Sequence, residues 1–170
     1  MPTAASTHSL YLVRHGIAAA RGPSWPDDTK RPLTPKGTTR VRQIARGLQR
    51  LDVDIDVVLT SPLVRAKQTA ELLADGLKPS PTLHVTSALS PGVGPAALVE
   101  ALQSYRKARG VALVGHEPDL GEFAAWLTGA EAPLPFKKGG ICRIDIPSAH
   151  GHGSGQIVWF ATPRMLRALR

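Results

Sequence analysis

The chain of 170 residues is long enough for one domain with a single hydrophobic core, and its 42% hydrophobic and 20% charged content excludes an intrinsically disordered protein. A formal net charge of +8 favours anionic partners. Nucleic-acid binding is nevertheless disfavoured as the main role, because no run of five consecutive Lys or Arg residues occurs and aromatic residues make up only 5%.

The N-terminal part of the chain begins with a strand pattern and continues with a helix pattern. Residues 1–9 are polar and small, without the basic start and apolar stretch of a signal peptide, and we expect a flexible tail. The apolar run 10–14 predicts a buried strand, and the proline-rich segment 22–33 predicts a loop.

Thr34 and Pro35 are typical of a helix start. The buried stripe of this helix is expected to consist of Val41, Ile44, Ala45, Leu48 and Leu51. The arginines largely off that stripe, interpreted as a solvated face, are Arg40, Arg42, Arg46 and Arg50.

The rest of the chain continues the alternation of strands and helices. The run 55–59 predicts a second strand, and Ser61 and Pro62 are expected to cap the next helix. Further elements are predicted in chain order: strand 83–85, helix 95–106, strand 111–114, helix 118–127, strand 141–146 and strand 156–160. This order predicts an α/β fold, a three-layer sandwich around a mostly parallel sheet with one antiparallel strand.

The single cysteine, Cys142, lies in the apolar run 141–146 and is expected to be a buried strand residue. One thiol cannot form an internal disulfide, which indicates a reducing compartment. No apolar run approaches the roughly 20 residues that a membrane-spanning helix needs. We therefore expect one cytoplasmic domain over residues 1–170, with no membrane contact.

Three polar segments follow the ends of predicted strands: Arg14-His15-Gly16, Arg65 and His116. Right-handed crossovers bring the ends of parallel strands to one edge of the sheet, where α/β proteins bind ligands. Arg65 is expected in the first turn of a helix, where a bound anion would offset the unfavourable position of a cation beside the positive end of the helix dipole. We therefore expect these residues to form one anion site.

The residue types in this site suit phosphoryl transfer. Arg14 and Arg65 supply two positive charges, which match a phosphoryl dianion. The same charges lower the pKa of a nearby imidazole, so His15 is expected to be neutral and to act as the nucleophile. His116 is expected to donate a hydrogen bond to an equatorial oxygen as charge spreads in the transition state.

No cofactor or metal ion is expected at this site. The chain has no HExxH or CxxC motif and no acidic cluster that would hold a metal. His150 and His152 lie in the glycine-rich segment 150–155, and we interpret them as loop residues in preference to metal ligands.

These motifs resemble the histidine phosphatase superfamily, also called the phosphoglycerate mutase-like family. The segments that carry the resemblance, in this order and spacing, are 12–16 (LVRHG), 31–37 (RPLTPKG), 61–70 (SPLVRAKQTA) and 114–116 (VGH). The short chain and the final segment 161–164 are most similar to the compact SixA-type phosphohistidine phosphatases. The resemblance implies a phosphohistidine intermediate on His15, and a phosphate pocket of Arg14, His15, Arg65 and His116 in an α/β sandwich.

The identity of the proton donor is left open by the sequence. Mutases and sugar phosphatases of the family carry a glutamate after the third strand, but residues 88–94 contain no carboxylate here. Protonation of the leaving group commonly contributes roughly 10²–10⁴-fold to the rate. Glu117 is the nearest candidate and resembles the acidic residue of the acid-phosphatase branch, although a helix N-terminal carboxylate is an equal interpretation. Asp27 and Asp28 are weaker candidates.

Phosphohistidine on a partner protein is the substrate that these observations favour. Its imidazole leaves readily once protonated, and an open site suits a phosphorylated side chain of another protein. Positive charge would steer acidic partners to the site. The leading hypothesis is therefore a metal-independent protein phosphohistidine phosphatase. The alternatives are a small-molecule phosphomonoesterase of the same chemistry and a non-catalytic phosphate-binding module.

Overall fold

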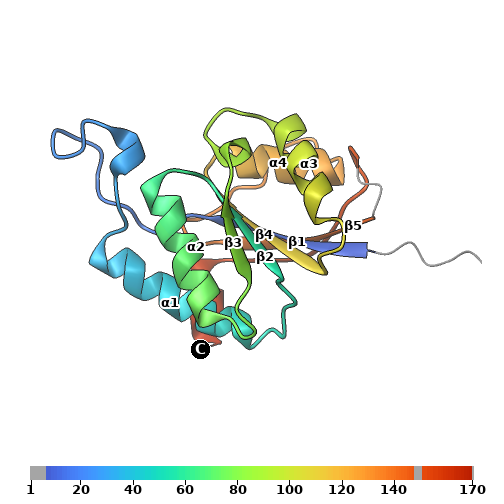
Figure 1. Cartoon of the computed structure of the whole chain (residues 1–170), viewed down its shortest axis with the longest axis horizontal. Helices are drawn as coiled ribbons and strands as arrows, with labels where there is room; N and C mark the ends of the chain where they lie inside the picture. The colour runs from blue at the N-terminus through green and yellow to red at the C-terminus, as the bar shows by residue number, and fades with distance from the viewer. Residues whose placement is uncertain (1–6, 148–150, 170) are drawn as a thin grey trace, which may run out of the picture.

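A six-stranded sheet forms the centre of the protein, and the computed structural model describes residues 7–147 and 151–169 (Figure 1). In sheet order the strands are β3 (Thr82–Val85), β2 (Val57–Thr60), β4 (Gly110–Gly115), β1 (Thr7–Arg14), β5 (Ile141–Pro147) and β6 (Gln156–Ala161). β3, β2, β4 and β1 pair in parallel, whereas β5 is antiparallel to both of its neighbours. Within the described residues only β5 runs against the other strands, which confirms the expected mostly parallel sheet with one antiparallel strand.

Helices cover both faces of the sheet. α1 (Pro35–Gln49), α2 (Val64–Gly76) and α5 (Pro163–Ala168) pack on one face, and α3 (Pro95–Leu102) and α4 (Asp119–Thr128) pack on the other (Figure 1). The alternation of side chains along β1 explains both contacts. Tyr11 and Val13 join the core under α1 and α2, whereas Leu10 and Leu12 join the core under α3 and α4. The three-layer sandwich is therefore confirmed.

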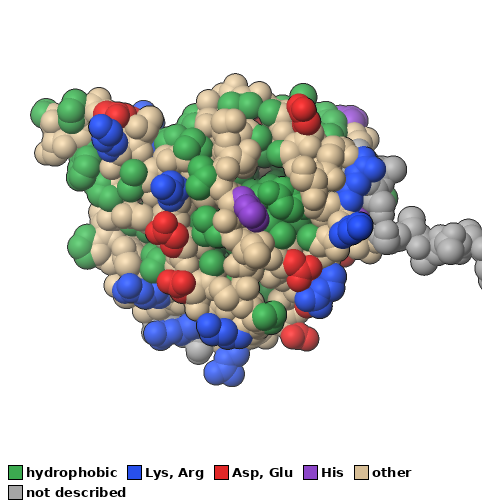
Figure 2. Space-filling model, viewed as in Figure 1, with side chains coloured by type: hydrophobic (Ala, Val, Ile, Leu, Met, Phe, Trp, Pro, Cys, Tyr) green, Lys and Arg blue, Asp and Glu red, His purple; other side chains and the backbone are tan. Residues whose placement is uncertain are grey.

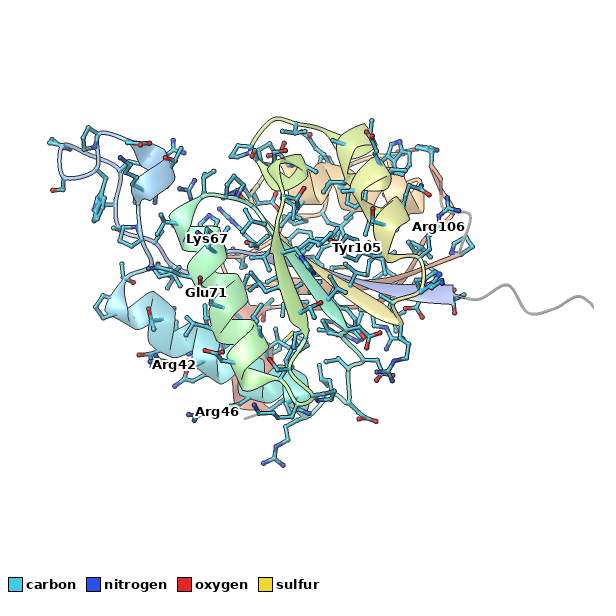
Figure 3. All side chains as sticks on the ribbon, in the orientation of Figure 1. Arg42, Arg46, Lys67, Glu71, Tyr105 and Arg106 are labelled. Atoms are coloured by element: carbon cyan, nitrogen blue, oxygen red, sulfur yellow. The ribbon has the colours of Figure 1, made fainter. Side chains whose placement is uncertain are left out.

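The long helix α1 begins as the sequence predicts. The Thr34 hydroxyl accepts a hydrogen bond from the Gly37 N–H at 2.9 Å, and Pro35 occupies the first turn. The predicted stripe is buried up to Leu48, but Leu51 is 38% exposed because the helix ends at Gln49. Arg42 and Arg46 lie on the exposed side of α1 (Figure 3), and Lys and Arg side chains gather along the lower edge of this face (Figure 2).

Several element boundaries differ from the sequence prediction. β1 begins at Thr7, three residues early, because Thr7, His8 and Ser9 pair with the end of β5. These three residues are therefore part of the sheet and not of a tail; residues 1–6 lie outside the described residues. The helix predicted over 95–106 ends at Leu102 and continues as a 3₁₀ turn, η3 (Gln103–Tyr105). Two further 3₁₀ turns are η1 (Asp28–Lys30) and η2 (Ser87–Leu89).

Ser61 does not cap α2. The helix starts at Val64 with Leu63 as its cap residue, and Leu63 makes no side-chain cap hydrogen bond. Ser61 is fully buried at the end of β2 instead. Arg65 still lies in the first turn of α2, as predicted.

Cys142 is fully buried in β5, and burial raises the pKa of its thiol to about 12, which makes it a structural residue. No helix among residues 7–147 and 151–169 is long and apolar enough to cross a membrane.

The carboxyl ends of β1, β2 and β4 meet at one edge of the sheet. Arg14 lies beside Gly115 in the parallel register of β1 and β4, and Thr60 lies beside Val114 in that of β2 and β4. The register continues past the strands, because the His15 N–H donates to the Gly115 carbonyl at 3.1 Å. Polar residues that follow three strands are thus placed next to one another.

Candidate active site

An open cleft of about 550 Å³ lies beside this edge of the sheet. All five predicted site residues line it: Arg14, His15, Arg65, His116 and Glu117. Asp28 from the loop after β1 lines the cleft as well. Asp27 does not, since its carboxylate is exposed and accepts hydrogen bonds from Thr29. The tertiary structure therefore brings together the predicted arginines, histidines and glutamate, and separates the two aspartates.

His15 presents its Nε2 atom as a free base. Its Nδ1 lies 2.7 Å from the Gly16 carbonyl oxygen, which can only accept a hydrogen bond, so Nδ1 carries the proton. Burial, with further contributions from the charges of Arg65 and Arg14, lowers the pKa of His15 to about 4, although the hydrogen bond to Gly16 opposes this shift. The imidazole is therefore neutral at pH 7, and the lone pair on Nε2 is available for attack.

His116 has the opposite tautomer, which Ser61 selects. The Ser61 Oγ accepts a hydrogen bond from the Leu63 N–H at 3.3 Å and lies 2.8 Å from His116 Nε2. We assign the serine proton to the bond with Nε2, which leaves the proton of the neutral ring on Nδ1. Burial, followed by the proximity of His15 and Arg65, lowers the pKa of His116 to about 3. The His15 and His116 ring centroids are 5.2 Å apart, so His116 places an Nδ1–H donor beside the His15 ring.

Both arginines use their terminal nitrogens for structural contacts. Arg14 Nη1 donates to the Phe136 carbonyl at 2.6 Å. Arg65 Nη1 donates to the Asp28 carbonyl at 2.8 Å, and Arg65 Nη2 lies 3.0 Å from the Asp28 carboxylate. These contacts hold both guanidinium groups in place and leave the Nε–H of each without a protein acceptor.

The buried polar atoms without a hydrogen-bond partner are concentrated in this cleft. Among the described residues, four buried side-chain nitrogen or oxygen atoms lack a partner: Arg14 Nε, Arg65 Nε, His116 Nδ1 and Glu117 Oε1. All four belong to side chains that line the cleft. Leaving a buried polar group unpaired costs about 1–3 kcal/mol, so such a cluster indicates a site completed by a ligand. Three N–H donors and one carboxyl group suit a tetrahedral oxyanion and a group that receives a proton.

The pKa values of the two acidic residues of the cleft are shifted in opposite directions. Asp28 is partly desolvated, but hydrogen bonding to Arg31 and the charges of Arg65, Arg31 and Arg21 hold its pKa below the ordinary value. Burial instead raises the pKa of Glu117, against the opposing charge of Arg14. Asp28 is therefore an ionised partner of arginines, whereas the raised pKa of Glu117 makes it the better proton donor of the two.

The chain is similar in sequence and in fold to known histidine phosphatases. A family model described as the histidine phosphatase superfamily (branch 1) matches residues 10–90. An uncharacterized protein of Picosynechococcus is 38% identical over 164 residues, covering 92% of this chain and 98% of that protein. Phosphohistidine phosphatase SixA of Escherichia coli is 32% identical over 161 residues, covering 93% and 96%. The chain belongs to the histidine phosphatase superfamily.

The structure of this histidine phosphatase agrees with that assignment. A solved structure of the protein histidine phosphatase SixA complexed with tungstate matches it with a TM-score of 0.82 and 29% identity, over 93% of this chain and 99% of that one. The resemblance recognised in the sequence motifs is therefore confirmed, as are the phosphoglycerate mutase-like fold and phosphatase activity.

The histidine phosphatase site also contains residues that sequence reasoning missed. The Thr69 Oγ1 accepts a hydrogen bond from the Gly16 N–H at 3.0 Å and donates to the Arg65 carbonyl at 2.7 Å, which ties the nucleophile loop to α2. Arg31 is buried and donates to Asp28 and to the Ala19 carbonyl. Thr69 lies one helical turn after Arg65, and this spacing could have indicated that Thr69 belongs to the site. The partners of Arg31 could not be predicted, because they depend on the conformation of the loop after β1.

The glycine-rich loop contributes nothing to this cleft among its described residues. The His152 ring packs edge-on against Trp126, with centroids 5.9 Å apart. His150 lies outside the described residues. Within the described residues, no three His, Cys, Asp or Glu side chains gather as a metal site would require.

Ser61→Ala tests the tautomer of His116. Loss of the hydroxyl frees His116 Nε2 to take the proton, and we expect turnover to fall about tenfold while the fold is kept. The ¹⁵N chemical shifts of the His116 ring report the tautomer directly and should show both tautomers in the variant. Thr60→Val is the matched control, because Thr60 is an equally buried neighbour whose hydroxyl bonds to the Ser61 carbonyl and not to His116. An unchanged ¹⁵N pattern in Ser61→Ala would contradict the assignment.

Proposed function

We propose that this histidine phosphatase hydrolyses phosphohistidine on a partner protein, through a phosphohistidine intermediate on His15 and without a metal ion. The observation that carries the proposal is the cluster of three unpaired N–H donors beside a neutral imidazole base. The E. coli relative at 32% identity is a phosphohistidine phosphatase, and the similar SixA structure is complexed with tungstate, a tetrahedral oxyanion like phosphate.

Binding uses the three free donors. The phosphoryl oxygens of the substrate would accept hydrogen bonds from Arg14 Nε, Arg65 Nε and His116 Nδ1. The two guanidinium groups supply positive charge where the negative charge of the phosphoryl group spreads in the transition state. These fixed charges support metal-independent catalysis.

Two displacements complete the reaction. In the first, His15 Nε2 forms a bond to phosphorus as the phosphorus–nitrogen bond of the substrate breaks, and the leaving imidazole takes a proton from Glu117. The phosphorylated His15 ring keeps its Nδ1 proton, whose bond to the Gly16 carbonyl stabilises the positive charge of the ring. In the second displacement, water attacks phosphorus and gives a proton to the Glu117 carboxylate, the phosphorus–nitrogen bond to His15 breaks, and phosphate leaves with the His15 Nε2 lone pair restored.

Glu117 is assigned as the proton donor, and its effect should depend on the leaving group. Glu117→Gln removes the proton but keeps the shape, so we expect alkyl phosphate turnover to fall roughly 10²–10³-fold. Phosphohistidine turnover should fall less than tenfold, because protonated imidazole is a better leaving group.

The pH profile of alkyl phosphate turnover should also change in Glu117→Gln. Its alkaline limb should disappear, because the raised pKa of Glu117 produces that limb, whereas the acid limb, set by His15 near pH 4, should remain. Glu122→Gln, which changes an exposed carboxylate in the first turn of α4, shortly after Glu117, is the control. Equal losses on both substrates would exclude this role.

The direct test of the proposed function is to trap the intermediate. Rapid quench with a labelled phosphodonor in EDTA, followed by peptide mapping, should give an acid-labile and alkali-stable label on the peptide that contains His15. In parallel, kcat/KM for a phosphohistidine protein is compared with that for sugar and nucleotide phosphates. Turnover without label would exclude the covalent mechanism, and a preference for the small phosphates would favour a small-molecule phosphomonoesterase.

A further inference from the structure

The cleft carries more positive charge than a phosphoryl group neutralises. Its cationic side chains are Arg14, Arg21, Arg31, Arg65 and Lys138. Asp28 is ionised and balances one of these charges, and a phosphoryl dianion balances two more. Even with Glu117 ionised and balancing another charge, one positive charge stays unmatched when the phosphoryl group is bound. A substrate that fits this cleft therefore carries further negative charge close to its phosphoryl group.

Lys138 carries unmatched positive charge that a substrate can reach. The Arg31 side chain is buried against Asp28, and Arg21, although 79% exposed, is ion-paired with Asp28 at 3.1 Å. Lys138 is exposed, and its ammonium group makes no hydrogen bond or ion pair with any of the described residues. Its charge reaches the nucleophile, because it contributes to the lowered pKa of His15.

The backbone fixes Lys138 relative to the catalytic residues. The Gly139 N–H lies 3.0 Å from the Arg14 carbonyl and 3.1 Å from the His15 carbonyl, and the Arg14 N–H donates to the Gly140 carbonyl at 3.1 Å. Gly139 has a φ of +83°, a conformation that side chains disfavour, which lets the turn close on the end of β1. Lys138 therefore stands at the rim of the cleft, while its exposed neighbour Lys137 does not line the cleft.

We propose that Lys138 is a specificity residue that binds an acidic side chain flanking the phosphohistidine of the partner protein. This inference rests on the proposed function. The phosphoryl oxygens already have three buried donors, so an exposed ammonium group at the rim is better placed for the surface around the phosphorylated residue. A carboxylate of Asp or Glu on the partner supplies the missing negative charge.

The test uses the full chain and two synthetic phosphohistidine peptides, one with glutamates and one with glutamines beside the phosphohistidine. The measured quantity is the selectivity ratio, kcat/KM for the glutamate peptide divided by that for the glutamine peptide. An exposed ion pair corresponds to a ratio of about three to five in the wild type at low salt. Lys138→Gln should reduce the ratio to about one, mainly through KM, and Lys137→Gln should leave it at the wild-type value. High salt should reduce the wild-type ratio in the same way.

Each other outcome has a definite meaning. A ratio near one in the wild type, a ratio unaffected by Lys138→Gln, or an equal loss in Lys137→Gln overturns the assignment of Lys138. A failure of the proposed function looks different: the wild type would then hydrolyse phosphoramidate but release phosphate from neither peptide, and the inference about Lys138 would fall with it.

Discussion

Replacing His15 with asparagine is expected to reduce phosphatase turnover on the order of 10⁴-fold or more, because the change removes the imidazole that we propose as the nucleophile. Asparagine is chosen because its side-chain amide keeps a donor for the Gly16 carbonyl, so the buried oxygen is not left unpaired. The fold should therefore be preserved. Steady-state turnover, labelling of the protein by the phosphodonor and thermal unfolding are measured together.

The control for His15→Asn is His84→Ala. His84 is an exposed histidine of β3 whose ring contacts Tyr105 and which does not line the cleft. His84→Ala should keep wild-type turnover and labelling. Retained turnover in a stably folded His15→Asn variant would show that another residue is the nucleophile, and turnover lost together with the folded structure would make His15 a structural residue.

Arg65→Gln should have the second largest effect, a fall in kcat/KM of roughly 10²–10³-fold. The change removes the Nε–H donor and the positive charge from the phosphoryl site. Arg65→Lys should recover little of the loss, because a lysine cannot contact Asp28 through two nitrogens and still present a third donor. Phosphate binding, measured by competition with a phosphorylated substrate, should weaken together with turnover.

The structure also predicts how Arg65→Gln affects the fold. Asp28 retains Arg31 and Arg21 as partners, so the loop after β1 should stay in place. Arg109→Gln is the matched control, because Arg109 pairs with Asp54 and Asp56 at an exposed site away from the cleft. That control should change the stability little, because exposed ion pairs contribute weakly, and should leave turnover unchanged. A fully active Arg65→Gln variant would mean that Arg65 does not bind the phosphoryl group.

The location of the candidate site could be predicted from the sequence because it follows from chain direction. Apolar runs mark β1, β2 and β4, and parallel pairing places their carboxyl ends together wherever the intervening helices lie. Arg14, His15 and His116 follow two of these strands directly, so their meeting required no knowledge of side-chain packing. The position of Glu117 beside these residues could be predicted for the same reason. Its role as a proton donor could not be predicted, because the pKa of a carboxyl group depends on burial.

Contacts between distant segments account for the errors. Ser61 had every local feature of a helix cap, but its hydroxyl bonds to His116, 55 residues away. Thr7 to Ser9 are polar and suggested a tail, but pairing with the end of β5 includes them in the sheet. Asp28 was a weak acid candidate, and only its contact with Arg65, 37 residues away, shows it to be an anchor for that arginine.

By itself the sequence determined the order of strands and helices, the mostly parallel sheet and the five predicted site residues that line one cleft, because hydrophobic periodicity and strand direction are local properties with a predictable global result. The tertiary structure decided which groups are protonated, which tautomer each histidine adopts and which donors are free for a ligand. These properties depend on burial and on hydrogen bonds between residues far apart in the chain. They also depend on the positions of the loop that contains Asp28 and of the turn that contains Lys138, which no local sequence pattern encodes.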